Sequence, residues 1–172
     1  MSQALLEVRD LNVSFATRDG PVHAVKNLNF HMAPGEVLGV VGESGSGKTQ
    51  AALAILGLMA DNGQVSGSIR FEGDELVGLR AARMNQIRGD RIAMVFQDPM
   101  TSLNPYLTIG AQMALVLKMH RNMTGAAARA ECVKLLDAVH ITDPASRLRM
   151  FPHELSGGMR QRAMIATALL CQ

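Results

Sequence analysis

Apolar and polar residues alternate along the start of the chain, which is the pattern of a half-buried strand. Residues 6–15 alternate with one shift of phase at residues 9–10, where we expect a β-bulge. A turn at residues 17–20 and a second alternating stretch, Leu28–Met32, complete a predicted antiparallel hairpin. The run Val37–Val41 contains no polar side chain, and this predicts a parallel strand that is buried on both faces.

Strands and helices alternate from residue 48 to residue 96. Lys48–Ala60 is apolar at nearly every position, which predicts a buried helix, whereas Arg80–Gln86 predicts a polar one. Ser68–Phe71 is a predicted short strand, and Ile92–Phe96 is a predicted second buried strand. This alternation indicates an α/β fold.

The pattern becomes helical from Thr108 onward. It runs to Val139 with a break at residues 122–125, where Thr124 is a predicted N-cap. Pro144 can open a short helix, and Met159–Leu170 is the last predicted helix. We therefore predict four parts: an antiparallel β subdomain at 1–36, a core at 37–107, a helical subdomain inserted at 108–150, and a final segment at 151–172.

Composition places the chain among globular proteins and argues against several classes. Of its 172 residues, 48% are hydrophobic and 19% are charged. The net charge of +2 is too small to indicate a nucleic-acid partner. No clearly apolar run approaches the roughly 18 residues that span a bilayer, and charged residues near the start argue against a signal peptide. Cys132 and Cys171 lack metal-ligand spacing, so we expect free, reduced thiols in the cytosol.

The segment GESGSGKT carries the first candidate chemistry. It matches G-x-x-x-x-G-K-[ST] and lies between a predicted strand and a predicted helix. Glycines let phosphate oxygens approach backbone N–H groups, and the helix start adds the positive end of its dipole. We expect Lys48 to reach the β- and γ-phosphates and the Thr49 hydroxyl to ligate Mg²⁺. The predicted nucleotide-binding residues here are Gly42, Glu43, Ser44, Gly45, Ser46, Gly47, Lys48 and Thr49.

The alternative for this loop is a flexible glycine–serine turn, but the strand before it and the helix after it favour nucleotide binding. The loop alone does not distinguish a kinase from a GTPase or an ATPase. A second helix start, with Ser156, Gly157 and Gly158, offers another anion site, although a serine N-cap before a glycine turn would look the same. A symmetric head-to-tail pair of chains would use both sites for each nucleotide.

These two segments resemble known motifs. LSGGMRQR at residues 155–162 resembles the signature motif of ABC transporter ATPases, and GESGSGKT resembles their Walker A motif. Phe96–Pro105 is similar to the Q-loop of the oligopeptide, dipeptide and nickel importer branch, and residues 151–162 point to the same branch. The resemblance covers essentially the whole chain. It implies that Gln97 contacts Mg²⁺ and the attacking water, and that Phe15 stacks on adenine, with a strand core residue as the alternative for Phe15.

The resemblance also implies a fold, cofactors and partners. The implied fold is the ABC ATPase core of the P-loop NTPase type, with an N-terminal antiparallel β subdomain and a helical insert. ATP and Mg²⁺ are the implied cofactors, and ATP hydrolysis would drive peptide uptake. The implied partners are integral-membrane permease subunits, a second homologous ATP-binding subunit in a head-to-tail dimer and, indirectly, a substrate-binding protein, at the cytoplasmic face of the cell membrane. Nucleic acid is not an expected partner.

The permease is expected to dock on residues 97–139. The helices there carry apolar residues that we expect to be exposed, namely Leu107, Met113, Val116 and Met119; the alternative is that they pack on the α/β core. Three other side chains are expected to have no role in a site. His153 is expected to be a surface or capping histidine, and Arg160 and Arg162 to lie on a solvated helix face.

The sequence departs from the family pattern at its end. The family continues with a strand that carries the Walker B aspartate and the catalytic glutamate, followed by a D-loop and a switch histidine, and none of these is found before Gln172. We therefore expect the C-terminal part of the core to be missing, and these residues to hold ATP without hydrolysing it. A truncated, binding-only module stays open beside the importer subunit. A non-transport ABC ATPase acting on DNA or ribosomes is disfavoured by the short insert and the small net charge.

Overall fold

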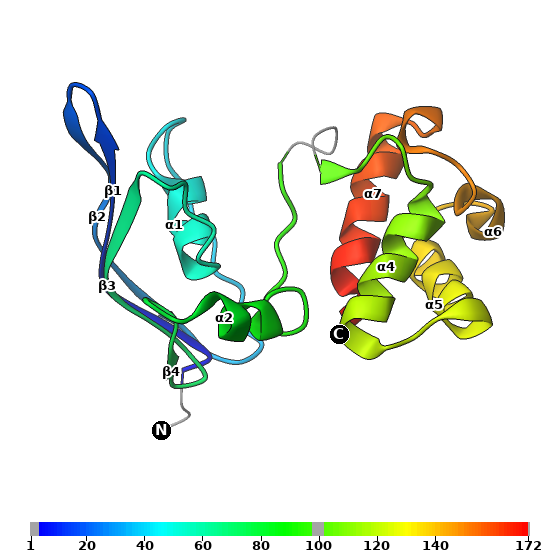
Figure 1. The fold of residues 1–172 in the computed structure, drawn as a ribbon, viewed down its shortest axis with the longest axis horizontal. Coiled ribbons are helices and arrows are strands. Elements are labelled where there is room, and N and C mark those ends of the chain that lie inside the picture. Colours follow the sequence, from blue (N-terminus) through cyan, green and yellow to red (C-terminus); the bar gives the residue numbers. More distant parts are fainter. Residues whose placement is uncertain (1–3, 98–101, 172) are drawn as a thin grey trace. The chain divides into compact units, whose positions relative to one another are not determined.

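The computed structural model of the chain describes residues 4–97 and 102–171 (Figure 1). It divides into two compact units, residues 1–85 and residues 86–172. The four parts predicted from the sequence stay a prediction, because these two units are defined by compactness alone.

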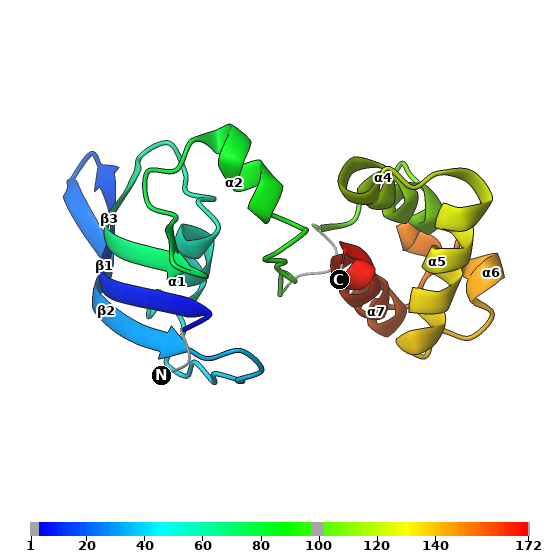
Figure 2. The ribbon, with the colours of Figure 1, turned by 90° about the horizontal axis from the view of Figure 1, so that it is seen from below.

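An antiparallel sheet dominates the first unit, and the predicted hairpin forms its first two strands (Figures 1 and 2). The strand order is β2-β1-β3-β4. Val8, Leu11 and Val13 of the inner strand β1 are buried, as is Ile69 of β3, and these β-branched and aliphatic side chains form the core under the sheet. The strands are β1 Leu6–Thr17, β2 Gly20–Met32, β3 Gly63–Phe71 and β4 Asp74–Glu75.

The bulge predicted in β1 is confirmed. The register between β1 and β2 shifts between Val8 and Leu11, and Asp10 has a φ of 48° there. This left-handed conformation is held by its surroundings. The backbone N–H of Asp10 donates to Asn29 Oδ1 at 2.8 Å, and a Cβ on Gly67 would lie only 2.4 Å from the Asp10 carbonyl oxygen. The missing side chain of Gly67 therefore makes room for the bulge.

Val37–Val41 is not a strand in the structure, and the prediction of a buried strand is wrong for this segment. Its conformation is irregular, and the side chains of Val37 and Val41 are each 94% exposed. Ile92–Phe96 likewise forms no strand beyond one isolated bridge between Arg88 and Ile92. A parallel strand needs neighbours that pair with its backbone and layers that cover its faces. Among residues 4–97 and 102–171, no strand pairs with either of these two segments.

The helices lie where the sequence predicted them, and caps decide where they end. The first helix ends at Ile55 rather than Ala60, because Gly57 adopts a φ of 59° and the N–H of Leu58 turns back to the Leu53 carbonyl oxygen at 2.9 Å. The helices are α1 Lys48–Ile55, α2 Ala81–Ile87, α4 Ile109–Arg121, α5 Gly125–Ala138, α6 Pro144–Arg147 and α7 Gly157–Ala168, with short 3₁₀ turns η1 Pro152–Glu154 and η2 Leu169–Cys171.

The second unit is helical, and α4, α5 and α7 enclose its core (Figure 2). Met113 and Leu117 of α4 pack in one buried cluster with Leu136 of α5. The two cysteines are free thiols within this cluster. Among the helices that the structure describes, none has both the length and the apolar composition needed to cross a membrane.

Candidate nucleotide-binding site

The predicted phosphate loop, residues 42–49, lies in the first unit and leads directly into α1. Lys48 holds the loop together, because its Nζ donates to the carbonyl oxygens of Gly42 at 2.7 Å and Glu43 at 2.6 Å and to Ser46 Oγ at 3.3 Å. All three acceptors are neutral. Within the described residues the ammonium has no carboxylate partner, so an anion can bind it without displacing a competing charge.

The start of α1 is open to an anion. Its N-cap is Gly47, and among the described residues no side chain accepts a hydrogen bond from the first turn. That turn also contains no acidic residue. Its backbone N–H groups therefore present the positive end of the helix dipole beside the Lys48 ammonium. The Thr49 side chain is exposed at the same helix start.

Gly47 fixes the loop against strand β2. A Cβ at this position would lie 2.1 Å from the Ala24 carbonyl oxygen, and φ is 89°. Gly45 has a similar φ of 80°, but a Cβ there would meet nothing within 4 Å. Gly47 is therefore required by both conformation and space, whereas Gly45 is required by conformation alone. The sequence does not indicate the role of Ala24, because a backbone carbonyl that supports a loop requires no particular side chain.

Phe15 lies on β1 opposite Val22 of β2 and Gly63 of β3. Its ring is half-buried, and a Cβ on Gly63 would lie 3.1 Å from Phe15 Cε1. The side chain therefore packs on the sheet while part of it stays open to solvent. Both interpretations of Phe15 fit this environment, and its contact with adenine stays a prediction.

Gln97 and the signature segment belong to the second unit, so no single unit contains all the predicted site residues. Gln97 is exposed at a bend, and residues 98–101 of the predicted Q-loop lie outside the described residues. Ser156 caps α7, since its Oγ accepts a hydrogen bond from the N–H of Met159 at 3.3 Å. The two glycines that follow are exposed, and a Cβ on either would meet nothing within 4 Å. An anion can therefore approach the backbone at this helix start.

The side chains that flank the signature segment agree only in part with the sequence analysis. His153 is exposed and its ring stacks on Phe151 with centroids 5.7 Å apart, as expected for a surface histidine. Arg162 is exposed, but Arg160 is half-buried, and its Nε is buried without a hydrogen-bond partner in the described structure. Arg160 departs from the prediction because Met164, four residues later on the same helix face, packs into the core.

A clamp that the sequence did not reveal holds the segment before α4. Gln112 Nε2 donates to the carbonyl oxygens of Asn104 at 3.0 Å and Leu107 at 2.9 Å, and Gln112 Oε1 accepts from the N–H of Asn104 at 2.9 Å. These three bonds tie residues 104–107 to α4. Tyr106, within this segment, is 87% exposed. The backbone of this segment is therefore fixed by hydrogen bonds, while the aromatic side chain of Tyr106 is exposed to solvent.

The predicted permease-docking residues divide into two groups. Leu107 and Met119 are exposed, as expected. Met113 is fully buried and Val116 is half-buried, so the prediction of exposure is wrong for Met113 and holds only partly for Val116. These two residues lie on the inward face of α4, where they pack on the helical core rather than on an α/β core.

Comparison with known proteins places this arrangement in a family. A family model described as ABC transporter matches residues 25–172. The chain belongs to the ABC transporter family. This ABC transporter chain is 54% identical over 171 residues to the oligopeptide transport ATP-binding protein OppD of Escherichia coli K12, a match that covers 99% of the chain and 51% of that protein. The OppD of Haemophilus influenzae is 56% identical over 168 residues, covering 98% and 52%. The chain spans about half the length of these curated relatives.

Solved structures support the same conclusion for the fold. A dimeric bacterial ABC transporter cassette matches this ABC transporter chain with a TM-score of 0.85 and 26% identity, covering 96% of the chain and 69% of the cassette. A component of an ABC transporter complex from Clostridium perfringens matches with a TM-score of 0.71 and 25% identity, covering 98% and 62%. The predicted α/β ABC cassette with an antiparallel β subdomain is therefore confirmed, as is the resemblance to oligopeptide transport ATP-binding proteins.

Proposed function

We propose that this chain is the nucleotide-binding part of an ATP-driven peptide importer, and that residues 42–49 hold the phosphates of ATP. The observation that carries the proposal is the Lys48 ammonium, which has only neutral acceptors and lies beside the uncapped start of α1. The relatives at 54% and 56% identity are described as oligopeptide transport ATP-binding proteins, which supports peptides as the substrate class.

The loop residues fit a chain of phosphates. Lys48 can exchange the carbonyl oxygens of Gly42 and Glu43 for phosphate oxygens, and each charge-assisted hydrogen bond gained contributes about 1.5–3 kcal/mol. The backbone at Gly45 and at the start of α1 has no Cβ or capping side chain in the way. Thr49 and Gln97 are the proposed Mg²⁺ ligands, and Mg²⁺ when bound neutralises charge on the phosphates.

Replacing Lys48 with alanine tests the phosphate assignment. The substitution removes the one full positive charge of the loop and keeps its backbone, so ATP affinity should fall by at least about 1.5 kcal/mol, which is roughly tenfold. Isothermal titration calorimetry measures this directly. Lys118→Ala is the matched control, because Lys118 is an exposed lysine in the last turn of α4. Equal ATP affinity in wild type and Lys48→Ala would remove the basis of the proposal.

A binding-only module is the second candidate, because Gln97 is the one catalytic residue predicted among these residues and it is neither an acid nor a base. Its side chain is an exposed amide that can orient a water molecule but cannot accept the proton that hydrolysis releases. The exposure of Val37 and Val41 also leaves an apolar segment uncovered immediately before the loop. We therefore propose that a polypeptide of residues 1–172 binds ATP without turning it over, whereas the whole importer hydrolyses ATP. Steady-state turnover by this polypeptide that disappears in Lys48→Ala would contradict the binding-only proposal.

The proposed partners follow from the starts of α1 and α7 and from the exposed apolar residues of the second unit. A second ATP-binding subunit would place its signature segment over the phosphate loop of this chain, in a head-to-tail dimer. The permease subunits would dock at the cytoplasmic face of the membrane on the exposed apolar residues of the second unit, and a substrate-binding protein would act through the permease. Cysteine pairs between residues 104–107 and a cytoplasmic permease loop should cross-link; cross-links that form only elsewhere would contradict this docking surface. The exposed residues are Tyr106, Leu107, Leu115 and Met119.

A further inference from the structure

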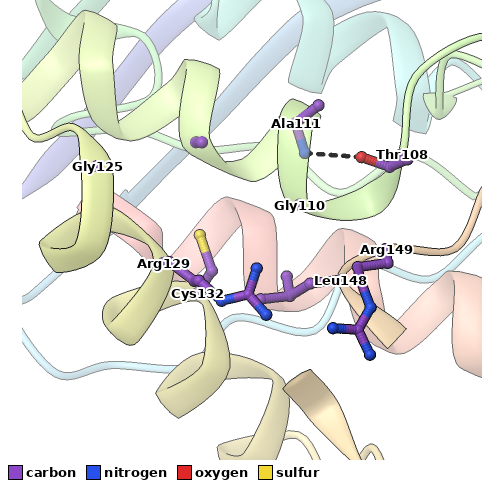
Figure 3. Close-up of a pocket in the computed structure, with 9 residues that line it drawn as sticks. Thr108, Gly110, Ala111, Gly125, Arg129, Cys132, Leu148 and Arg149 are labelled. Atoms are coloured by element: carbon purple, nitrogen blue, oxygen red, sulfur yellow. Dashed lines mark hydrogen bonds between the residues drawn. The ribbon is translucent and has the colours of Figure 1, made fainter. Parts of the chain in front are cut away.

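A cavity in the second unit has no part in the nucleotide proposal. Its volume is about 280 Å³, and it lies between the first turns of α4, the start of α5 and the segment that follows α6 (Figure 3). Small residues leave this space open at Gly110, Ala111, Ala114 and Gly125. Gly110 has a packing reason to be small, since a Cβ there would lie 2.8 Å from the Leu148 carbonyl oxygen.

Two arginines supply the charge of this cavity. Arg129 comes from α5 and Arg149 from the segment after α6, and in Figure 3 their guanidinium groups lie on either side of Leu148. Both arginines are exposed, and within the described residues neither guanidinium has a hydrogen bond or an ion pair. The described lining contains no acidic residue. The two positive charges are therefore not neutralised from inside the cavity.

The remaining polar groups of the cavity are already satisfied or neutral. The first N–H groups of α4 are all used: Ile109 donates to Met150 O, Gly110 to Leu148 O, and Ala111 to Thr108 Oγ1. Burial, with a smaller contribution from Glu131, raises the pKa of the Cys132 thiol to about 11, so this floor residue is uncharged at neutral pH. The charged ligand donors of the cavity are thus the two guanidinium groups, the Thr108 hydroxyl is a neutral donor beside them, and the other walls are mostly aliphatic.

We propose that this cavity binds a carboxylate that carries a short apolar body. A guanidinium fork matches the two oxygens of a carboxylate, and Arg129 and Arg149 can share one such group at the cavity mouth. The apolar body would contact Ala111, Ala114 and Leu148. The volume lies just below the usual range for pockets that hold drug-sized ligands, which limits the occupant to a small molecule or a single acidic side chain of a bound protein.

Calorimetry with sodium hexanoate, and with hexanamide as its uncharged isostere, tests the proposal on the full chain. Hexanoate should bind and hexanamide should not. Arg129→Gln and Arg149→Gln should each weaken hexanoate binding at least about threefold, as expected for the loss of one charge-assisted bond at an exposed site. Arg18→Gln is the matched control, because Arg18 is an exposed arginine in the β1–β2 turn. Ala114→Leu should abolish binding by filling the cavity, and circular dichroism confirms that each variant is folded.

A blocked acidic peptide, acetyl-Leu-Asp-Leu-amide, separates the two sources of the carboxylate. Binding of hexanoate alone identifies a free small acid as the ligand class, and binding of the peptide alone identifies a protein side chain; both support the carboxylate site. The proposal is overturned if neither probe binds, if hexanamide binds as well as hexanoate, or if the arginine variants bind like wild type. Loss of hexanoate binding in Lys48→Ala alone would place the site at the phosphate loop and would also overturn it.

Discussion

Replacing Gly47 with alanine tests whether strand β2 positions the phosphate loop. The added Cβ would lie 2.1 Å from the Ala24 carbonyl oxygen, whereas an ordinary contact of this kind begins near 3.4 Å. Neither partner is a flexible side chain, so α1 or β2 must move by more than about an ångström. Alanine is also unfavourable at the φ of 89° that Gly47 adopts.

The expected loss of stability has two parts. A left-handed conformation costs an L-residue about 1–2 kcal/mol, and forcing an atom into occupied space costs about 1–3 kcal/mol, so Gly47→Ala should destabilise the chain by about 2–5 kcal/mol. Gly45→Ala is the matched control, because Gly45 has a φ of 80° and open space around its Cα. It should carry only the conformational cost of about 1–2 kcal/mol. The difference between the two variants isolates the contact with Ala24.

Urea unfolding followed by circular dichroism measures both variants, and ATP calorimetry reports the effect on the loop. Gly47→Ala should unfold at a clearly lower urea concentration than Gly45→Ala and should lose at least about tenfold in ATP affinity, since displacement of the loop misplaces several phosphate contacts together. Equal urea midpoints for the two variants would refute the argument that β2 supports the loop. An unchanged ATP affinity in a destabilised Gly47→Ala would show that the displaced loop still binds phosphate.

Three further predictions concern other parts of the chain. Burial raises the pKa of the Glu75 carboxyl, but hydrogen bonds from Ser68 and from the Ile69 and Val77 backbone outweigh burial and lower this pKa below its usual value. The resulting stability is present above the unfolded-state pKa and is lost as pH falls through the folded-state pKa. Glu75→Gln should therefore flatten the acid side of a profile of urea midpoint against pH. Cys132, with its pKa raised to about 11, should react with Ellman's reagent at neutral pH far more slowly in the folded chain than in urea, and equal rates would contradict its burial. Gly110→Ala should lower stability by about 1–3 kcal/mol through its overlap with Leu148. Gly158→Ala adds its Cβ in open space within α7, where alanine suits a helix better than glycine, so this control should not lower the urea midpoint.

Local patterns in the sequence determined most of the secondary structure and the candidate chemistry. The alternation in β1, with its shift at residues 9–10, predicted the hairpin and the bulge because side chains on a strand alternate between two faces. Thr124, the predicted N-cap, is the N-cap of α5, although its side chain makes no capping hydrogen bond. Ser156 caps α7 by accepting a hydrogen bond from the N–H three positions later, which is a local interaction. The glycines and the lysine of residues 42–49 indicated a phosphate loop because close approach of an anion to backbone N–H groups restricts the residue types.

The tertiary structure decided which apolar segments are covered and which backbone supports the loop. Val37–Val41 looks like a buried strand in the sequence, but a strand forms only where neighbouring strands pair with it, and the described residues offer no such ladder. Met113 faces inward because it lies on the side of α4 that packs against α5 and α7. The contact of Gly47 with the Ala24 carbonyl joins segments that are distant in the chain through a backbone atom, and no residue-type pattern reports such a contact.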